Sequence, residues 1–320
     1  MRALILSAVV MLFTVFGVFA SENSMEKQKT AVVIAAFGTT YDSALSSLLS
    51  ISHELEKNTG DIPVRMAFTS NIIRKIWHSR KNDTEYRNSH KEVPEYLYDV
   101  KNVLGTLADL QNEGYKTVVV QPTYIYAGEE YADLLAYTDA LNGIKTLKDK
   151  WKPFTAIAVG KPVTGAYEYK EDLNRFAEVL KADVDLARKN KTALVYMGHG
   201  NEHLSTGIYF ELEIVMNAMY PDVKTFIGTV EGHPDVEDVI AGLKRVKAKS
   251  VTLKPLMIVA GDHAQNDMAS DEEDSWKTLL SKAGIRVIPV VEGLGENPGV
   301  RKIIADNMKK AAEENGIKLH

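Results

Sequence analysis

The sequence contains no cysteine among its 320 residues. This absence excludes disulfides, thiolate metal sites, cysteine nucleophiles and iron–sulfur clusters. A bound metal ion would therefore take His, Asp, Glu or backbone oxygen ligands. The absence does not indicate a compartment, because an exported protein need not carry disulfides.

Basic charge is also scarce. Lys and Arg number 38 against 43 Asp and Glu, which gives a net charge of -5 and an isoelectric point near 6.0. The sequence has no long Lys/Arg run, so it argues against nucleic acid as a partner, because phosphate binding needs a concentrated basic face. A phosphate-binding Gly-Lys-Ser/Thr motif is absent as well, so no nucleotide site is expected.

The N-terminus has the pattern of a secretory signal peptide. Arg2 supplies a positive charge, residues 3–20 are almost wholly apolar, and Val18 and Ala20 are small residues before a polar stretch. This pattern predicts cleavage near Ala20 and a periplasmic protein without a stable membrane anchor. The alternative is an uncleaved anchor, because the apolar run is near the lower length limit for a membrane span. We favour cleavage.

The rest of the chain alternates short apolar runs with amphipathic stretches, which predicts parallel strands separated by helices. Pro94 looks like a helix start, with one apolar face running through Leu97, Val100, Leu104 and Leu107. A second helical face, at Leu173, Phe176, Leu180 and Val184, is expected to bridge two halves. The predicted strands are 31–36, 63–68, 117–125 and 154–159, then 192–197, 223–230, 250–259 and 285–291.

The two halves share residues as well as pattern. QPTYIYAGEE at 121–130 matches KPLMIVAGDH at 254–263, and Phe37-Gly38-Thr39 matches Met197-Gly198-His199. We interpret this as a duplicated α/β domain, each copy a parallel four-stranded sheet flanked by helices. The predicted organisation is a signal peptide at 1–20, an N-terminal domain at 21–165 and a C-terminal domain at 166–320. Ligands are expected in a cleft beyond the carboxyl ends of the strands.

Three polar side chains follow successive strands of the second half. His199 ends its first strand, Glu231 ends its second and His263 follows its third, each in a Gly-flanked turn. Two imidazoles and one carboxylate suit a borderline divalent cation such as Co²⁺, Ni²⁺, Fe²⁺ or Zn²⁺ and leave positions open for exchange. The alternative is that each is an ordinary polar loop residue. His233 is expected to lie at the rim or at a helix start.

Several strings resemble those of the sirohydrochlorin cobaltochelatases of the anaerobic cobalamin pathway, the CbiK type of class II chelatase. The resemblance covers nearly the whole chain after residue 30, and the string at 255–271 is its most specific part. The matching strings are MGHG at 197–200, VEG at 230–232, PLMIVAGDHA at 255–264 and NDMASD at 266–271, with AFTS at 67–70, GEEY at 128–131 and GLGENP at 293–298.

The resemblance implies a ferrochelatase-like fold and ATP-independent insertion of Co²⁺, or alternatively Fe²⁺, into sirohydrochlorin or a related tetrapyrrole. It implies that His199, Glu231 and His263 bind the metal and carry the catalysis. An imidazole can accept a pyrrole proton near neutral pH, and Glu231 balances charge or relays protons. The predicted signal peptide departs from a cytoplasmic biosynthetic enzyme and puts the physiological substrate in doubt.

Other residues are candidates for holding the macrocycle. Cations are expected to pair with its carboxylates, and tyrosines to stack on its ring, although surface exposure and simple packing are the alternatives. The cationic candidates are Arg65, Arg74, Lys75 and Arg80, and the tyrosines are Tyr124, Tyr126 and Tyr131.

A rival function is an exported metal- or haem-binding carrier on the same scaffold. His78 and His90 are the candidate haem ligands, because they flank a polar segment at 79–91 that is expected to be a surface excursion. Haem there would be structural or lie between subunits. The sequence leaves a homo-oligomer open.

Overall fold

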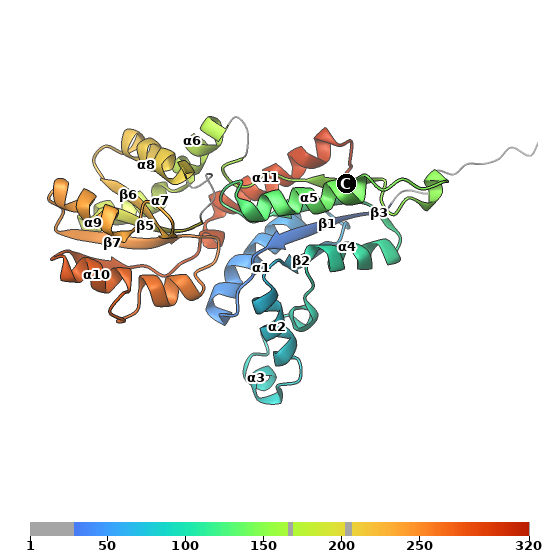
Figure 1. Ribbon diagram of the computed structural model, residues 1–320, viewed down its shortest axis with the longest axis horizontal. Coiled ribbons are helices and arrows are strands. Elements are labelled where there is room, and N and C mark those ends of the chain that lie inside the picture. Colours follow the sequence, from blue (N-terminus) through green and yellow to red (C-terminus); the bar gives the residue numbers. More distant parts are fainter. Residues whose placement is uncertain (1–28, 166–168, 202–206, 320) are drawn as a thin grey trace, which may run out of the picture.

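The computed structural model describes residues 29–165, 169–201 and 207–319 and places two parallel four-stranded sheets side by side (Figure 1). The predicted signal peptide at 1–20 lies outside the described residues. No helix in the described ranges is both long and apolar enough to cross a membrane. The sheets have the same strand order, β2-β1-β3-β4 in the first half and β6-β5-β7-β8 in the second. The predicted fold class is confirmed.

Every predicted strand is present within a few residues of its expected ends. β1 illustrates why, since residues 31–36 have no exposed surface, as expected for a central strand covered by helices on both faces. The strands are β1 Lys29–Ala36, β2 Val64–Phe68, β3 Tyr115–Pro122 and β4 Ala156–Val159, then β5 Ala193–Gly200, β6 Thr225–Glu231, β7 Ser250–Leu256 and β8 Arg286–Pro289.

Helices cover the sheets and join the halves. Leu48, Ile51 and Leu55 are buried on α1, where their three- and four-residue spacing places them on one face of the helix. The helices of the first half are α1 Asp42–Lys57, α2 Asn71–Arg80, α3 Thr84–Ser89, α4 Val103–Asn112 and α5 Glu129–Asn142. Those of the second half are α6 Tyr169–Val179, α7 Lys181–Asn190, α8 Gly207–Met219, α9 Val236–Arg245, α10 Trp276–Lys282 and α11 Pro298–Glu314.

One apolar core runs through both halves. Leu173 and Phe176 on α6, with Leu180 and Val184 at the start of α7, are buried in the same cluster as residues of β1 and β5. The expected bridging face is therefore present, although it is divided between two helices. The shared core fixes the two sheets relative to each other, which a site between them requires.

The last helix returns to the first half. α11 packs against β3, β4 and α1, and Figure 1 shows it in red beside the first sheet. Asn307 on α11 donates to the Pro162 carbonyl at 2.9 Å, which ties the helix to the loop after β4. By sequence, α11 belongs to the predicted C-terminal domain at 166–320. It nevertheless packs on the first half, so the chain returns to that half after β8.

The helix predicted from Pro94 through Leu107 is wrong. A 3-10 helix spans Glu95–Asp99, the backbone then extends, and α4 begins only at Val103, leaving Leu104 43% exposed. The extended stretch is explained by the sheet, because the Phe68 amide donates to the Lys101 carbonyl at 2.9 Å. The preceding α2 and α3 project from the first half (Figure 1).

Candidate metal-binding cleft

A cavity of about 480 Å³ lies at the carboxyl ends of both sheets, where the turns after β1, β3, β5 and β7 meet. Parallel topology accounts for this position, because the loops that follow the strands gather at one edge of each sheet. Its lining is Phe37, Gly38, Thr39, Thr40, Tyr41, Leu48, Ser70, Ile72, Ile73, Ile76, Thr123, Tyr124, Ile125, Tyr126, Glu130, His199, Gly200, Tyr209, Leu256, Met257, Ile258, Val259, Gly261, Asp262 and His263.

His199 lies near the end of β5 and is half-buried. Its Nδ1 is 2.7 Å from the Gly200 carbonyl oxygen. Gly200 has φ +74°, and a Cβ there would lie 1.9 Å from the Glu231 carbonyl oxygen, so only glycine fits. This close approach of β5 and β6 holds the imidazole at the sheet edge and leaves its Nε2 available.

His263 follows β7 and begins a single π-helical turn at Ala264–Met268. Its Nδ1 is 2.5 Å from Oδ2 of Asp267, four residues later. A carboxylate behind a histidine fixes the ring orientation and favours the tautomer whose Nε2 is free to bind a metal. π-Helical turns occur frequently at functional sites.

The structure brings these two imidazoles together. The ring centroids of His199 and His263 are 4.8 Å apart with the planes nearly perpendicular. Both Nδ1 atoms are engaged in hydrogen bonds, which leaves the two Nε2 atoms as the candidate ligand atoms of the pair. Imidazole nitrogen is a favoured ligand for Co²⁺, Fe²⁺ and Zn²⁺, so the pair can hold such an ion.

Glu231 does not complete a compact triad. Among the residues that the structure describes, the ligand atoms of His199, Glu231 and His263 do not all lie within 4.8 Å of one another. Glu231 ends β6 beside Gly200 and is exposed. Glu231 is not among the residues that line the cavity, and it contributes to the raised pKa of Tyr126 after burial, Glu130 and Glu129.

A second group of ligand atoms lies just past β6. His233, Asp235 and Asp238 have one ligand atom each within 4.8 Å of the others. Asp235 and Asp238 form the capping box of α9, in which each side chain accepts from the other residue's backbone amide. That bonding accounts for the placement of both carboxylates, and His233 lies at a helix start as expected.

Two of the three candidate tyrosines line the cleft, and the third does not. Tyr124 and Tyr126 are lining residues, whereas Tyr131 is buried in the core on the other face of the first sheet. The Tyr126 hydroxyl accepts from Asn201 at 2.9 Å, and its ring lies edge-on to Tyr209, with centroids 5.3 Å apart. Burial is the main cause that raises the pKa of Tyr126 to about 12.

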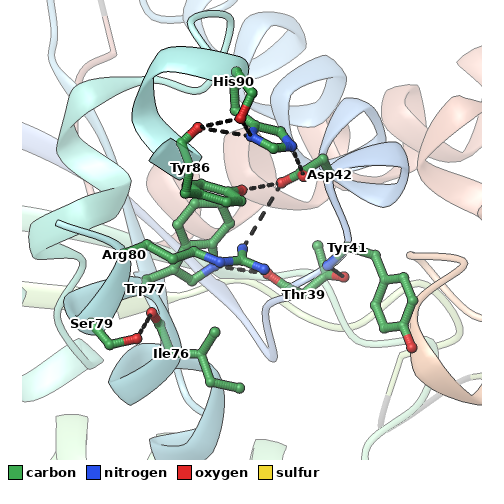
Figure 2. Close-up of polar contacts among 10 residues, drawn as sticks. Thr39, Tyr41, Asp42, Ile76, Trp77, Ser79, Arg80, Tyr86 and His90 are labelled. Carbon is green, nitrogen blue, oxygen red and sulfur yellow. Dashed lines mark hydrogen bonds and ion pairs between the residues drawn. The ribbon is translucent and has the colours of Figure 1, made fainter. Parts of the chain in front are cut away.

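None of the four predicted cations lines the cleft. Arg65 forms a bidentate pair with Glu113, and Arg74 donates to the carbonyls of Phe68 and Thr69. Figure 2 shows Arg80 between the rings of Trp77 and Tyr86. Its guanidinium carbon is 4.6 and 4.3 Å from their centroids. The fourth, Lys75, is exposed on α2.

The two candidate haem ligands are occupied by protein contacts. His78 Nε2 is 2.8 Å from the Val100 carbonyl oxygen. His90 stacks on Tyr86, and its two ring nitrogens lie 2.8 Å from the Tyr86 carbonyl oxygen and 3.0 Å from the Asp42 carboxylate (Figure 2). These contacts give the projecting segment a structural explanation and lend haem ligation no support.

Sequence reasoning missed two features of the site. Asp267 stands four residues after His263, a spacing that indicates a carboxylate–histidine pair once that stretch is expected to be helical. The Tyr41 hydroxyl donates to Asp262 at 2.7 Å and so joins the first half to the turn that holds His263. No local pattern signals that contact, because 221 residues separate its partners.

Solved structures with a similar fold include two of SirB from Bacillus subtilis. One is described as SirB with Fe³⁺ (TM-score 0.55, 11% identity, 90% of this chain and 98% of the other). The other is the sirohydrochlorin chelatase SirB in complex with cobalt (TM-score 0.55, 13% identity, 90% and 97%). At these identities the likeness is one of fold.

Sequence comparison is more specific. A protein of Salmonella typhimurium named sirohydrochlorin cobaltochelatase is 31% identical over 285 residues, covering 88% of this chain and 96% of its own length. A Nitratidesulfovibrio vulgaris protein named sirohydrochlorin cobaltochelatase CbiKC is 31% identical over 290 residues, covering 91% and 93%. The model of the family described as cobalt chelatase (CbiK) matches residues 30–313. Because that match spans nearly the whole sequence, the chain belongs to the cobalt chelatase (CbiK) family.

Proposed function

We propose that this protein is a metal chelatase that inserts Co²⁺ into sirohydrochlorin without nucleotide. The observation that carries the proposal is the His199–His263 pair, at 4.8 Å between ring centroids, on the wall of a largely apolar cavity. Relatives of similar length bear the name of this activity. A flat apolar ring needs such a surface, and a divalent cation needs such a pair of nitrogens.

The residues suggest the order of events. Co²⁺ binds first to the free Nε2 atoms of His199 and His263, in an open coordination sphere. The macrocycle enters above them, and its nitrogens replace the imidazoles as ligands of the ion. Two pyrrole protons leave as the divalent ion enters, which keeps the charge of the metallated ring unchanged.

The freed imidazoles are placed to receive those protons. The Asp267 carboxylate at Nδ1 of His263 orients that ring for the transfer. Glu231, exposed at the end of β6, connects the site to solvent and can pass a proton outward. No step in this sequence needs a phosphate-binding loop.

Fe²⁺ is the alternative metal substrate. Imidazole and carboxylate ligands do not separate Co²⁺ from Fe²⁺ sharply, so the side chains of the cleft accommodate both ions. Parallel insertion rates with the two metals under anaerobic conditions measure the preference.

The direct test is anaerobic incubation of the purified protein with sirohydrochlorin and Co²⁺, following the absorbance change of the macrocycle. We expect insertion by the wild type and its loss in His263→Ala with the fold kept. His233→Ala is a matched control, because that histidine is exposed and lies outside the cavity lining. An unchanged insertion rate in His263→Ala would remove His263 from the mechanism.

We also propose export to the periplasm, on the basis of the pattern around Arg2 and residues 3–20. Cell fractionation with mass spectrometry of the mature N-terminus tests it. Recovery from the periplasm with a new N-terminus near Ser21 supports export, and recovery of the uncleaved chain from the cytoplasm contradicts it.

A further inference from the structure

The first half contributes an apolar lip to the cleft. Phe37, Ile72 and Ile76 line the cavity and are 46%, 73% and 36% exposed. Ile72 and Ile76 are one helical turn apart on α2, so they present one face. Such a patch beside the metal-binding pair suits the face of a flat apolar ring.

The charged groups of the cleft are acidic. No lining residue in the described part of the chain is Lys or Arg, whereas Glu130 and Asp262 both are lining residues. The two internal stretches outside the described residues, 166–168 and 202–206, contain no Lys or Arg in their sequence. A carboxylate of the substrate would therefore meet like charge inside this cleft.

The tyrosines of the cleft respond to the same negative field. The hydrogen bond to Asp262 raises the pKa of Tyr41, and burial followed by Glu130 raises that of Tyr124. Acidic groups also add to the effect of burial on the pKa of Tyr126. No Lys or Arg is among the charges that act on these three phenols.

The two arginines of α2 are held in contacts outside the cleft. Arg74 folds back onto the carbonyls after β2, and Arg80 is fixed between two aromatic rings beside Asp42 (Figure 2). Moving either guanidinium into the cleft would break these contacts. Recognition of substrate carboxylates by bidentate arginine is therefore not built into this cleft.

We infer that the cleft recognises the face of the tetrapyrrole ring and leaves its edge carboxylates in solvent, so that it metallates rings with few carboxylates as well as sirohydrochlorin. The inference rests on the proposed chelatase function, and it specifies which part of the tetrapyrrole the same site recognises. Apolar contact with Phe37, Ile72 and Ile76 supplies the affinity, and the acids at the wall disfavour inward-facing carboxylates.

The first test compares Co²⁺ insertion into sirohydrochlorin and into deuteroporphyrin, a dicarboxylate porphyrin, with the wild-type protein. We expect kcat/KM values within about tenfold of each other, because a site built to pair with the missing groups would reject the analogue by about 10⁴-fold. Insertion into sirohydrochlorin alone would overturn the inference and keep the proposed function. Insertion into neither would remove the proposed function, and the inference with it.

Salt gives a second readout on the same two substrates. Like charges on the cleft and on sirohydrochlorin slow their encounter, and added salt screens that repulsion. We expect kcat/KM for sirohydrochlorin to rise between low and physiological ionic strength, with a smaller rise for deuteroporphyrin. A fall with salt for sirohydrochlorin would show attraction to cations and contradict the inference.

A positive charge introduced at Ile72 tests whether the apolar lip of Phe37, Ile72 and Ile76 contacts the substrate. We expect Ile72→Lys to raise kcat/KM for sirohydrochlorin by roughly two- to fivefold, the size of an exposed ion pair, and to lower that for deuteroporphyrin. Ser79→Lys is the matched control, because Ser79 is exposed on the same helix but does not line the cavity. An unchanged ratio of the two substrates in Ile72→Lys, or an equal change in Ser79→Lys, would overturn the role given to the lip.

Discussion

The two sheets of this protein have the same strand order but carry different side chains at their carboxyl ends. β1 and β5 occupy equivalent positions, yet Gly38 is followed by Thr39 in the first half and Gly198 by His199 in the second. After β3 the matched string ends in Glu130, and after β7 it ends in His263. The duplicated scaffold therefore supplies two sets of loops around one cleft, and only the second set holds the paired imidazoles.

The first half contributes surface rather than ligands. Its turns and α2 present Phe37, Ile72 and Ile76 to the cavity, and the second half adds His199 and His263 to the same lining. A chelatase needs both elements, a donor pair for the ion and an apolar wall for the ring. The comparison teaches that two sheets of the same strand order can carry different functional groups at their carboxyl ends.

The largest expected effect separates His263 from its counterpart Glu130. His263→Ala removes a proposed ligand and proton acceptor, and it should lower Co²⁺ insertion by about 10³-fold, within the range for loss of a catalytic acid–base group. Glu130→Ala should change the rate by no more than a few fold, because Glu130 is exposed and offers the cavity no imidazole nitrogen. Equal losses in the two variants, measured anaerobically by absorbance, would mean that the halves share the chemistry.

The buried residues before the matched prolines give a stability comparison. Lys254 pairs with Asp183 at 2.6 Å, and Tyr196 donates to the same carboxylate, so Lys254→Met strands a buried charge. We expect a loss of about 3–5 kcal/mol in the free energy of unfolding. Gln121→Leu in the first half breaks only neutral hydrogen bonds, at about 1–3 kcal/mol. Denaturant titration measures both, and an equal cost would contradict the assignment of a buried ion pair.

Asp267 has no acidic counterpart in the first half, where Leu134 occupies the matched position. Asp267→Asn removes the negative charge behind His263 and should weaken Co²⁺ binding by about 10–100-fold, the usual effect of such an outer partner. Asp271→Asn is the control, because Asp271 is exposed and pairs with Lys277 instead. Calorimetric titration with Co²⁺ measures the affinity of each variant. Identical affinities would mean that the His263–Asp267 pair does not contribute to metal binding.

The smallest effect concerns alkaline pH and Tyr126. Its pKa is raised from 10.0 in the free phenol to about 12. Folding therefore favours the neutral phenol, and that contribution to stability is present below pH 10 and is lost as pH rises from 10 to 12. Tyr126→Phe should flatten the decline of thermal stability in this range. A decline as steep as in the wild type would show that Tyr126 titrates freely.

Regular periodicity and parallel topology were predictable from the sequence. Residues 31–36 are an unbroken apolar run, which is typical of a central strand buried on both faces. The strings repeated in the two halves follow equivalent strands, so they indicated that both sheets contribute to one site. The break between Val100 and Val103 was not predictable, because it is caused by a hydrogen bond from β2 to Lys101. The spacing of apolar residues within a segment cannot predict a hydrogen bond to a strand elsewhere in the chain.

The candidate site was predictable in part for the same reason. The closeness of His199 and His263 was predictable because strand ends of a parallel sheet meet, whereas the direction of the Glu231 side chain depends on the turn geometry after β6. The predicted cations were placed by their nearness in sequence to β2. Their actual partners, such as Glu113 for Arg65, are set by packing across strands.

The most direct measurement is anomalous diffraction at the cobalt edge from crystals of the protein grown anaerobically and soaked with Co²⁺. We expect a single strong peak within bonding distance of Nε2 of both His199 and His263, and its loss in His263→Ala. Cobalt found only at the His233, Asp235 and Asp238 group, with the cleft empty, would contradict the assignment of the histidine pair.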